Sequence, residues 1–179
     1  MKSNTELIHQ WMEETIQKDW VCVDMTCGKG RDTLEMAKLA HHVTSIDIQE
    51  AAIEQAKALS SQYDNITFIQ DDHINISNYV KDFIHLAIFN LGYLPDGNKK
   101  IQTTADSTLM ALSKIYPRIR KNGYLVVTCY VGHKGGKEEH ETVKRWIDHY
   151  KNFETTIIDS GKRNAPITYI CKKTSFDSR

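Results

Sequence analysis

The stretch from position 21 to position 33 has residue types and a spacing that could hold a small organic ligand. It reads VCVDMTCGKGRDT: a short apolar run ends in Asp24, and Gly28 and Gly30 follow before a segment of helical character. Glycines let a ligand lie against bare backbone. A helix that begins near Arg31 would direct free N–H groups toward that ligand. The layout is that of a strand, a nucleotide-binding turn and a helix N-terminus, although a Gly-x-Gly pair alone also occurs in ordinary tight turns.

Acidic residues on both sides of this turn help to distinguish two cofactors. Asp24 stands just before the turn, Asp32 just after it, and Thr33 occupies the place of the third glycine of a dinucleotide fingerprint. The acids would repel the pyrophosphate of a nicotinamide dinucleotide. S-adenosylmethionine has no phosphate, and its amino group and sulfonium are cationic, so the acids favour it. We therefore predict S-adenosylmethionine as the cofactor, with a dinucleotide-dependent oxidoreductase as the alternative.

Polar or glycine-rich residues follow each of five predicted strands. In an open parallel sheet, ligands bind at the carboxyl ends of the strands, where such residues would meet. The segments concerned are 24–30, 47–49, 71–73, 90–93 and 130–136. A sheet that served only as a scaffold would need simple turns at these places, so the pattern indicates a binding site.

Acids in the second and third of these segments have positions suited to a nucleoside. Asp47, which Ile48 and Gln49 follow, stands seventeen residues after Gly30 and could accept both hydroxyls of a ribose. Asp71 or Asp72, before His73, could accept the exocyclic amine of an adenine. The alternatives are a helix-capping aspartate for the first and an Asx turn for either of the others.

The segment that begins at Asn90 could bind an amine. The carbonyl of Asn90 and the neighbouring backbone carbonyls, up to Tyr93, can accept hydrogen bonds from an amine nitrogen. Such a site would direct the nitrogen lone pair toward a methyl group and would act mainly by positioning. His133 or His73 could take up the released proton, because histidine titrates near neutral pH. The alternative for His133 is an ordinary histidine in a glycine-rich loop.

Hydrophobic periodicity predicts strands that alternate with helices. The predicted strands are 20–25, 42–48, 66–70, 84–89, 124–130, 153–159 and 165–172. The predicted helices are 5–18, 32–40, 50–61, 104–119 and 138–150, with one or two helical turns in 74–80. Pro117 should kink or end its helix, Asn122-Gly123 should form a stop and a turn, and the last two strands should form an antiparallel hairpin. The predicted fold class is α/β, a mostly parallel, Rossmann-like sheet with helices on both faces and a closing antiparallel hairpin.

Length and composition indicate one domain of ordinary size. Residues 1–179 should form a single domain, with the N-terminal helix within 1–19 packed on its core. Lysine plus arginine equals aspartate plus glutamate, 23 each, so the net charge gives no nucleic-acid signal and a polyanion would need a local patch. There is no apolar run long enough to span a membrane and no apolar signal core at the N-terminus. The four cysteines form no Cys-x-x-Cys pair, so we expect reduced thiols, no metal and a cytoplasmic protein.

With these residues in view, the sequence resembles the class I S-adenosylmethionine-dependent methyltransferases, whose seven-stranded sheet ends in such a hairpin. More narrowly it resembles the small bacterial YtqB-like proteins, the MnmM family. The stretches that carry the resemblance are 24–33, 90–95 (NLGYLP) and 130–136 (YVGHKGG). That family methylates the aminomethyl nitrogen of 5-aminomethyl-2-thiouridine at the wobble position of certain transfer RNAs, so the resemblance implies an amine acceptor in the tRNA anticodon loop.

The resemblance also implies roles for individual residues. Residues implied to hold the methionine part of the cofactor are Asp24, Thr26, Gly28 and Gly30, with Asp32 and Thr33 beside them. Asp47, Ile48 and Gln49 would hold the ribose, and Asp72 and His73 would border the adenine. Asn90, Tyr93, Tyr130 and His133 would surround the acceptor amine, the first, second and fourth as catalytic residues. Lys29 and Arg31 depart from the expected pattern, because they bring positive charge close to a cationic cofactor.

An RNA substrate would need basic and aromatic residues near the site. Candidates are Lys99, Lys100 and Lys134, with Tyr93 or Tyr130 stacking on an extruded base. The alternative for any one lysine is an ordinary solvated side chain. Three other functions stay open: methylation of ribosomal RNA, methylation of a small-molecule amine, and a non-catalytic binding module. A homodimer through the N-terminal helix or the final hairpin is a further possibility.

Overall fold

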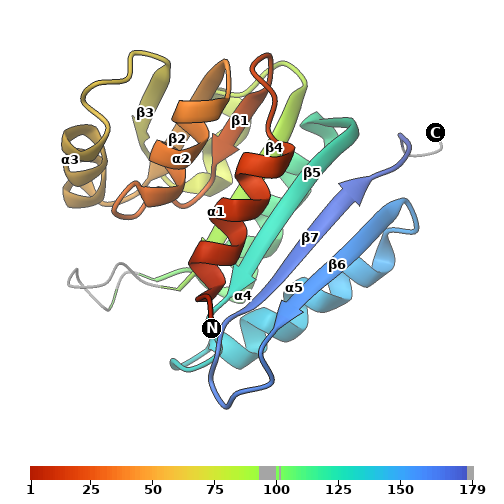
Figure 1. The fold of residues 1–179 in the computed structure, drawn as a ribbon. Coiled ribbons are helices and arrows are strands. Elements are labelled where there is room, and N and C mark those ends of the chain that lie inside the picture. Colours follow the sequence, from red (N-terminus) through yellow and green to blue (C-terminus); the bar gives the residue numbers. More distant parts are fainter. Residues whose placement is uncertain (93–99, 101, 177–179) are drawn as a thin grey trace.

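The computed structural model describes residues 1–92, 100 and 102–176, which form one seven-stranded sheet with helices on both faces (Figure 1). The strands are β1 (Val21–Asp24), β2 (His42–Asp47), β3 (Ile66–Gln70), β4 (Ile84–Leu91), β5 (Ile119–Cys129), β6 (Phe153–Asp159) and β7 (Ile167–Lys173). Their order in the sheet is β3-β2-β1-β4-β5-β7-β6. Pairing is parallel from β3 to β5, and β7 is antiparallel to both β5 and β6. The predicted α/β class with a closing antiparallel hairpin is confirmed.

The helices form one layer on each face of the sheet. They are α1 (Asn4–Thr15), α2 (Arg31–Leu39), α3 (Glu50–Leu59), α4 (Ala105–Ile115) and α5 (Gly136–His149), with short 3₁₀ helices η1 (His73–Asn78) and η2 (Tyr116–Arg118). Figure 1 shows α1, α2 and α3 in front of the sheet and α4 and α5 behind it. Helix α1 packs against α2, and α4 packs against α5 and η1. None of the described helices is long and apolar enough to cross a membrane.

The continuous apolar character of β1 follows from its central place between these two layers. Cys22 packs in the cluster under α1 and α2, and the next residue, Val23, packs in the cluster under α4 and α5. Both side chains are buried, because successive residues of a strand point to opposite faces. The apolar run therefore reflects burial on both faces. Asp24, its last residue, lies at the buried carboxyl end of the strand.

The segment from α4 to β5 corrects two predicted boundaries. The predicted helix 104–119 ends at Ile115, where η2 with Pro117 follows, and β5 begins at Ile119 instead of Tyr124. The predicted stop and turn at Asn122-Gly123 lies inside β5, where the register with β4 shifts between Ile84 and Leu86. Asn122 has a positive φ of 64° there. A bulge accommodates such turn-forming residues without ending the strand, so their local signal was misleading.

Smaller differences concern the ends of elements. Helix α1 ends at Thr15, three residues before its predicted end at Lys18. Strand β7 begins at Ile167 and not at Ala165. The region predicted as one or two helical turns is the 3₁₀ helix η1.

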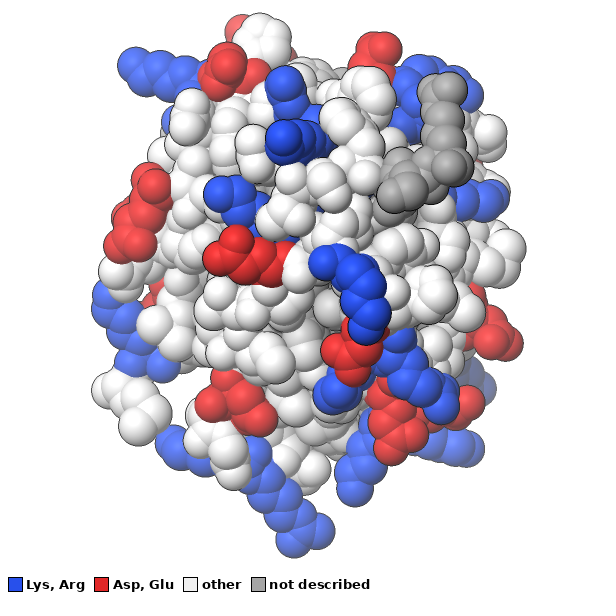
Figure 2. All heavy atoms as spheres, turned by 90° about the vertical axis from the view of Figure 1, so that its right-hand side faces the viewer, with Lys and Arg blue, Asp and Glu red and all other residues white. Residues whose placement is uncertain are grey.

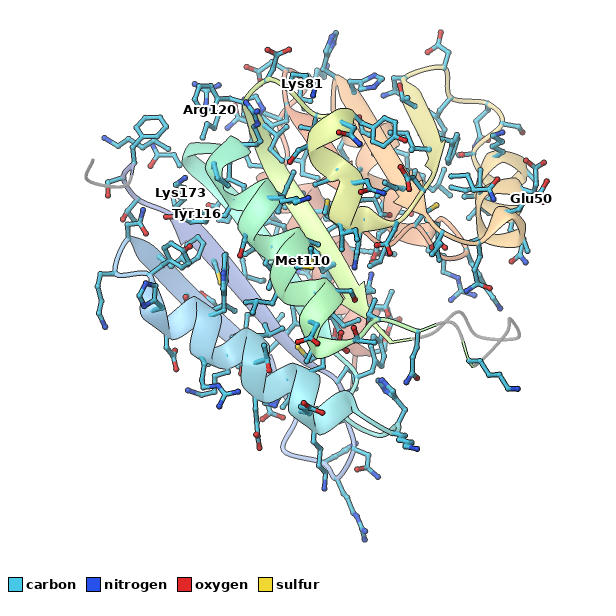
Figure 3. The ribbon with its side chains drawn as sticks, turned by 180° about the vertical axis from the view of Figure 1, so that it is seen from behind. Glu50, Lys81, Met110, Tyr116, Arg120 and Lys173 are labelled. Atoms are coloured by element: carbon cyan, nitrogen blue, oxygen red, sulfur yellow. The ribbon has the colours of Figure 1, made fainter. Side chains whose placement is uncertain are left out.

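The far end of α4 is held by a buried lysine. Seen from behind in Figure 3, Lys173 of β7 lies beside Tyr116 at the end of α4, and its Nζ is 4.0 Å from the centre of that ring. Nζ also donates to the backbone carbonyl of Tyr116 at 3.2 Å. These contacts stabilise the end of the sheet opposite to the strand ends described below.

The face formed by β6 and α5 carries both signs of charge. Figure 2 shows lysine, arginine, aspartate and glutamate interspersed over it. One pair on this face is Lys144 and Asp148 of α5, whose charged atoms lie 2.6 Å apart.

Candidate functional site

A cavity of about 730 Å³ lies where β1, β2, β4 and β5 end. Its lining includes eleven residues predicted as site residues from the sequence, ten from the five segments that follow the strands and Asp32 from the first turn of α2. They are Thr26, Gly28, Asp32, Asp47, Ile48, Gln49, Asp72, His73, Asn90, Tyr130 and His133. Segments that are up to about a hundred residues apart in the sequence therefore share one cavity, as expected for the carboxyl ends of parallel strands.

Asp24 lies behind the cavity wall and does not line it. It is fully buried, where Thr33 Oγ1 donates to one carboxylate oxygen at 2.7 Å and the Thr26 backbone N–H donates to the other at 3.2 Å. Thr33 Oγ1 also lies 2.7 Å from Ser45 Oγ, so the serine must be the donor of that pair. Burial and the charge of Asp32 raise the pKa of Asp24 to about 7, while these hydrogen bonds oppose the rise. Asp24 and Thr33 thus support the turn from inside.

Gly30 also stands outside the cavity lining, and its role in the turn is steric. It is the N-cap of α2 with a φ of +82°, a conformation that other residues rarely adopt. A Cβ atom at this position would lie 2.5 Å from Cβ of Ala56 in α3. The second glycine of the turn is therefore required for close packing of α2 on α3.

Asp47 fixes the turn from the neighbouring strand. Its two carboxylate oxygens accept hydrogen bonds from the backbone N–H groups of Gly28 and Gln49, each at 2.9 Å. The carboxylate lines the cavity, and each oxygen keeps a second acceptor site. The alternative interpretation of Asp47, a helix-capping aspartate, does not account for the hydrogen bond from Gly28, because Gly28 lies on the loop after β1.

The two acids after β3 separate into different roles. Asp71 accepts hydrogen bonds from Tyr79 and Asn75 at 2.7 and 2.9 Å and does not line the cavity. Asp72 lines the cavity and also caps η1. His73 is buried beside it, with Nδ1 3.2 Å from the carbonyl of Met25, and burial lowers the pKa of its imidazole. Of the two acids predicted to contact an adenine, only Asp72 lines the cavity.

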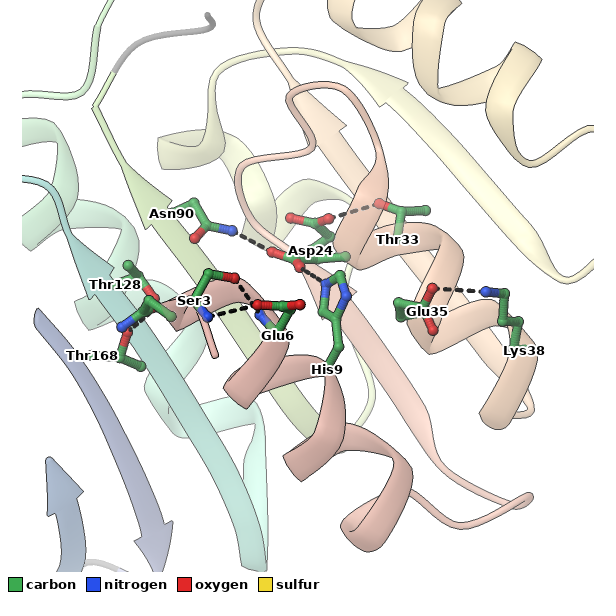
Figure 4. A network of polar contacts seen from close by, with 12 residues as sticks. Ser3, Glu6, His9, Asp24, Thr33, Glu35, Lys38, Asn90, Thr128 and Thr168 are labelled. Carbon is green, nitrogen blue, oxygen red and sulfur yellow. Dashed lines mark hydrogen bonds and ion pairs between the residues drawn. The ribbon is translucent and has the colours of Figure 1, made fainter. Parts of the chain in front are cut away.

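Asn90 is held by the turn and by α2. Its backbone N–H donates to Thr26 Oγ1 at 2.6 Å, and its side-chain Nδ2 donates to a carboxylate oxygen of Asp32 (Figure 4). The other oxygen of Asp32 lies 2.7 Å from Nε2 of His9, on α1. Asp32 raises the pKa of His9 through this hydrogen bond, while burial opposes the rise. Three elements, α1, α2 and β4, thus meet at one carboxylate.

The opposite wall of the cavity consists of glycine-rich loops after β4 and β5. A Cβ atom on Gly92 would lie 3.7 Å from the ring of His133, and one on Gly136 would lie 2.5 Å from the carbonyl of Tyr130. Tyr130 is 40% exposed, and burial of the rest of the side chain raises the pKa of its phenol. Glu139 stands behind this loop, where it accepts a hydrogen bond from Thr108 at 2.6 Å.

Two predicted substrate residues in the described part of the chain do not line the cavity. Lys100 and Lys134 are exposed and lie outside the lining. Tyr93 and Lys99 lie in the segment 93–99, which is outside the residues that the structure describes. Their roles stay predictions.

Several lining residues had no distinguishing signal in the sequence. They are Thr5 of α1, Gln102 and Thr103 after the undescribed segment, Ser107 of α4, and Asn164 of the β6–β7 loop. His9 was taken as part of a packing helix only, although its partner Asp32 was predicted. Each of these residues lies on an element that comes close to the cavity only when the chain is folded.

The charge of the cavity is mixed. Asp32, Asp47 and Asp72 line it, and so do Lys29 and Arg31, the two residues that departed from the expected pattern. Among residues 1–92, 100 and 102–176, no group of three or more His, Cys, Asp or Glu side chains is placed to hold a metal ion.

Comparisons with known proteins agree with this arrangement. An Arabidopsis thaliana protein named tRNA (mnm(5)s(2)U34)-methyltransferase, chloroplastic, is 36% identical over 159 residues, which cover 80% of this chain and 58% of that protein. This chain therefore spans less than two thirds of that relative. A crystal structure from Clostridium thermocellum, described as a "putative rRNA-methylase", is 30% identical with a TM-score of 0.89, covering 97% of this chain and 98% of that one. A Streptococcus mutans protein described as "a putative methyltransferase", in complex with SAH (S-adenosylhomocysteine), is 30% identical with a TM-score of 0.86, covering 97% of this chain and 99% of that one.

The family itself is identified by a direct match. Residues 43–171, more than half of the chain, match the family model described as "Putative rRNA methylase". The predicted resemblance to Rossmann-like class I methyltransferases is confirmed by this match and by the shared fold. This chain belongs to that rRNA methylase family.

Proposed function

We propose that this chain is an S-adenosylmethionine-dependent N-methyltransferase that converts the 5-aminomethyl group of the tRNA wobble (2-thio)uridine to 5-methylaminomethyl. The observation that carries the proposal is Asn90, whose amide nitrogen is bound by Asp32 at the edge of the cavity. The carbonyl oxygen of the same amide is thereby available for an amine. The relative from Arabidopsis thaliana, whose name describes the same wobble chemistry, supports the choice of substrate.

The residues around the turn suit S-adenosylmethionine. Asp32 and Asp47 offer carboxylates to a cationic ligand, and the Gly28 backbone leaves room for it. We assign the methionine part to Thr26, Gly28 and Asp32, with Asp24, Gly30 and Thr33 supporting them from behind. We assign the ribose to Asp47, Ile48 and Gln49, and the adenine to Asp72 and His73. When bound, this cofactor supplies an electrophilic methyl group, and SAH is the product that remains.

The acceptor side orients the amine and removes its proton. Asn90 Oδ1 accepts a hydrogen bond from the aminomethyl nitrogen, which fixes the direction of its lone pair. The nitrogen must be uncharged when the N–C bond forms, and it gives up one proton for each methyl group that it gains. His133, in the loop after β5, is suited to take up that proton. Tyr130 offers a partly exposed ring on which the base can stack.

The partner that we propose is the anticodon loop of a tRNA in the cytoplasm. A single-stranded loop can place a base in the cavity, whereas a paired base would have to leave its helix first. Lys100 and Lys134 are the described lysines that we assign to the RNA backbone, and Lys99 and Tyr93 stay predictions from the sequence. The assignment uses no metal and does not require a dimer.

Methylation of ribosomal RNA is the second candidate. The description of the matching family favours it. The two functions differ in the RNA that carries the acceptor and share the cofactor side of the cavity, so only a substrate experiment separates them.

The experiment is a labelling assay on bulk RNA. Transfer RNA and ribosomal RNA from cells that lack this protein are incubated separately with the purified protein and labelled S-adenosylmethionine, then digested to nucleosides and identified by mass spectrometry. The Asn90→Ala variant is the matched control. The proposal predicts label on 5-methylaminomethyl-2-thiouridine from tRNA. Label on a ribosomal nucleoside alone, or on no nucleoside although the protein binds SAH, would contradict it.

A further inference from the structure

The carboxylate of Asp32 lies between two side chains that the sequence separates widely. One oxygen receives Asn90 Nδ2 from β4, and the other lies 2.7 Å from His9 Nε2 on α1 (Figure 4). The three residues therefore form a chain from the outer helix layer to the edge of the cavity. Neither His9 nor Asp32 falls within residues 43–171, which match the family model.

The pairing with Asp32 fixes which way the Asn90 amide points. An ionised carboxylate only accepts hydrogen bonds, so the amide atom bound to it must be the nitrogen. The amide group is planar, and Figure 4 shows its oxygen turned away from Asp32.

His9 holds the second oxygen of the Asp32 carboxylate through a hydrogen bond. The hydrogen bond and charge of Asp32, with a smaller contribution from Glu35, raise the pKa of the imidazole, while burial and Lys38 oppose the rise. The side chains of His9 and Asp32 are only 21% and 13% exposed. Solvent screens such a shielded pair less than an exposed one, so the contact between His9 and Asp32 is stronger than a fully exposed pair would be.

Helix α1 is built to present this histidine. Its N-cap Ser3 and Glu6 form a reciprocal capping box, with hydrogen bonds of 2.6 and 3.2 Å. Ile8 and Met12 are buried against the sheet, and Thr5 lines the cavity. The register of the buried side chains thus places His9 over the start of α2.

We propose that His9 is a positioning residue for methyl transfer, which acts through Asp32 to hold the carbonyl oxygen of Asn90 toward the acceptor amine. This inference rests on the proposed amine acceptor. It gives α1 a part in the reaction in addition to its packing role.

The first test compares three variants. His9→Leu removes the donor with a side chain of similar size, His9→Gln restores a donor of similar reach, and His41→Leu is the control at an exposed histidine outside the site. We expect His9→Leu to lower kcat about tenfold with the affinity for SAH within about twofold of the wild type. His9→Gln should recover most of that loss, and His41→Leu should behave as the wild type. An unchanged kcat in His9→Leu, or an equal loss in His9→Leu and His9→Gln, would overturn the proposal.

The second test does not depend on turnover. In the wild-type protein, nitrogen NMR should show a proton on Nε2 of His9, the ring nitrogen that faces Asp32. The side-chain amide signals of Asn90, identified by their loss in Asn90→Ser, should shift in His9→Leu and stay in place in His9→Gln. An Nε2 of His9 without a proton, or amide signals that do not respond to His9→Leu, would overturn the proposal. If no RNA is methylated by the wild type, the proposed function fails, and these signals still decide whether His9 orients Asn90.

Discussion

Helices α2 and α5 begin in the same way, each with a glycine N-cap in the left-handed conformation after a parallel strand. The φ angles of Gly30 and Gly135 are +82° and +84°. Their surroundings differ, because a Cβ atom on Gly30 would lie 2.5 Å from Ala56, whereas one on Gly135 would have no atom within 4 Å. The turn before α2 is closed against α3, and the turn before α5 is open.

The cavity has a closed half, formed by the ends of β1 and β2, and an open half, formed by the loop after β5. The polar groups of these two halves differ in the same way as the two turns. On the side of β1 and β2, Asp24 and Asp47 each accept two hydrogen bonds within the protein. On the side of β5, Tyr130 is 40% exposed, and Gly132 and Gly135 are exposed as well. A small cofactor can be enclosed by a wall that the protein builds in advance, while an RNA needs an open approach. Under the proposed function, the two glycine turns, alike in backbone, would serve these two needs.

The largest effect that we expect is on stability, from alanine at the two glycine N-caps. Gly30→Ala adds both left-handed strain and a clash with Ala56, and should lower the free energy of unfolding by about 3 kcal/mol. Gly135→Ala adds only the strain and should cost about 1 kcal/mol. Urea unfolding of both variants measures the difference. Equal losses would show that the closed turn contributes no packing.

The next effect concerns the pH dependence of stability through Asp24. Its pKa is about 7 in the folded protein and about 4 in an unfolded chain, so the folded state binds more protons between these values. The free energy of unfolding should therefore fall as pH rises from about 4 to about 7, by an amount on the order of 3 kcal/mol.

The matched variant for this prediction is Asp24→Asn, which removes the titration and keeps the shape of the side chain. Its free energy of unfolding should lack the part of the fall that is due to Asp24. Urea unfolding at a series of pH values measures both proteins. Parallel curves for the two proteins would contradict the raised pKa.

A smaller effect should distinguish Asp47, at the end of β2, from Asp71, which follows β3. Asp47→Asn weakens the acceptor that holds Gly28 and Gln49 and should lower the affinity for SAH about tenfold, equivalent to about 1.4 kcal/mol. Asp71→Asn is the control, because that side chain bonds Tyr79 and Asn75 outside the cavity lining. Isothermal titration calorimetry with SAH compares them. A similar loss in both variants would contradict the assignment of Asp47.

The closed half was the easier one to predict from the sequence. The apolar run of β1, the glycines and the acids after β1 and β2 are local patterns, and the structure has them at the predicted strand ends. The reason that Gly30 is needed was not local, since Ala56 lies in another helix. Sequence spacing also could not distinguish Asp71 from Asp72, because their roles depend on which side of η1 each one faces.

The open half depends more on contacts between distant segments. Asn164 reaches the cavity from the β6–β7 loop, and Thr5 and His9 come from α1. Asn122 and Gly123 read as a turn because their local preference is for a turn, yet β5 continues through them, because Ile119 before them and Tyr124 after them pair with β4. Local propensity gives way there to a sheet that many other residues stabilise.

The most direct test of the account uses Asn90→Ala and two measurements on the same protein. One is the single-turnover rate of methylation of an anticodon stem-loop that carries 5-aminomethyl-2-thiouridine, and the other is the affinity for SAH. If Asn90 positions the amine and the cofactor site is formed without it, the methylation rate should fall about a hundredfold, while the affinity for SAH stays within about threefold of the wild type. An unchanged rate, or a rate and an affinity that fall together, would contradict the account.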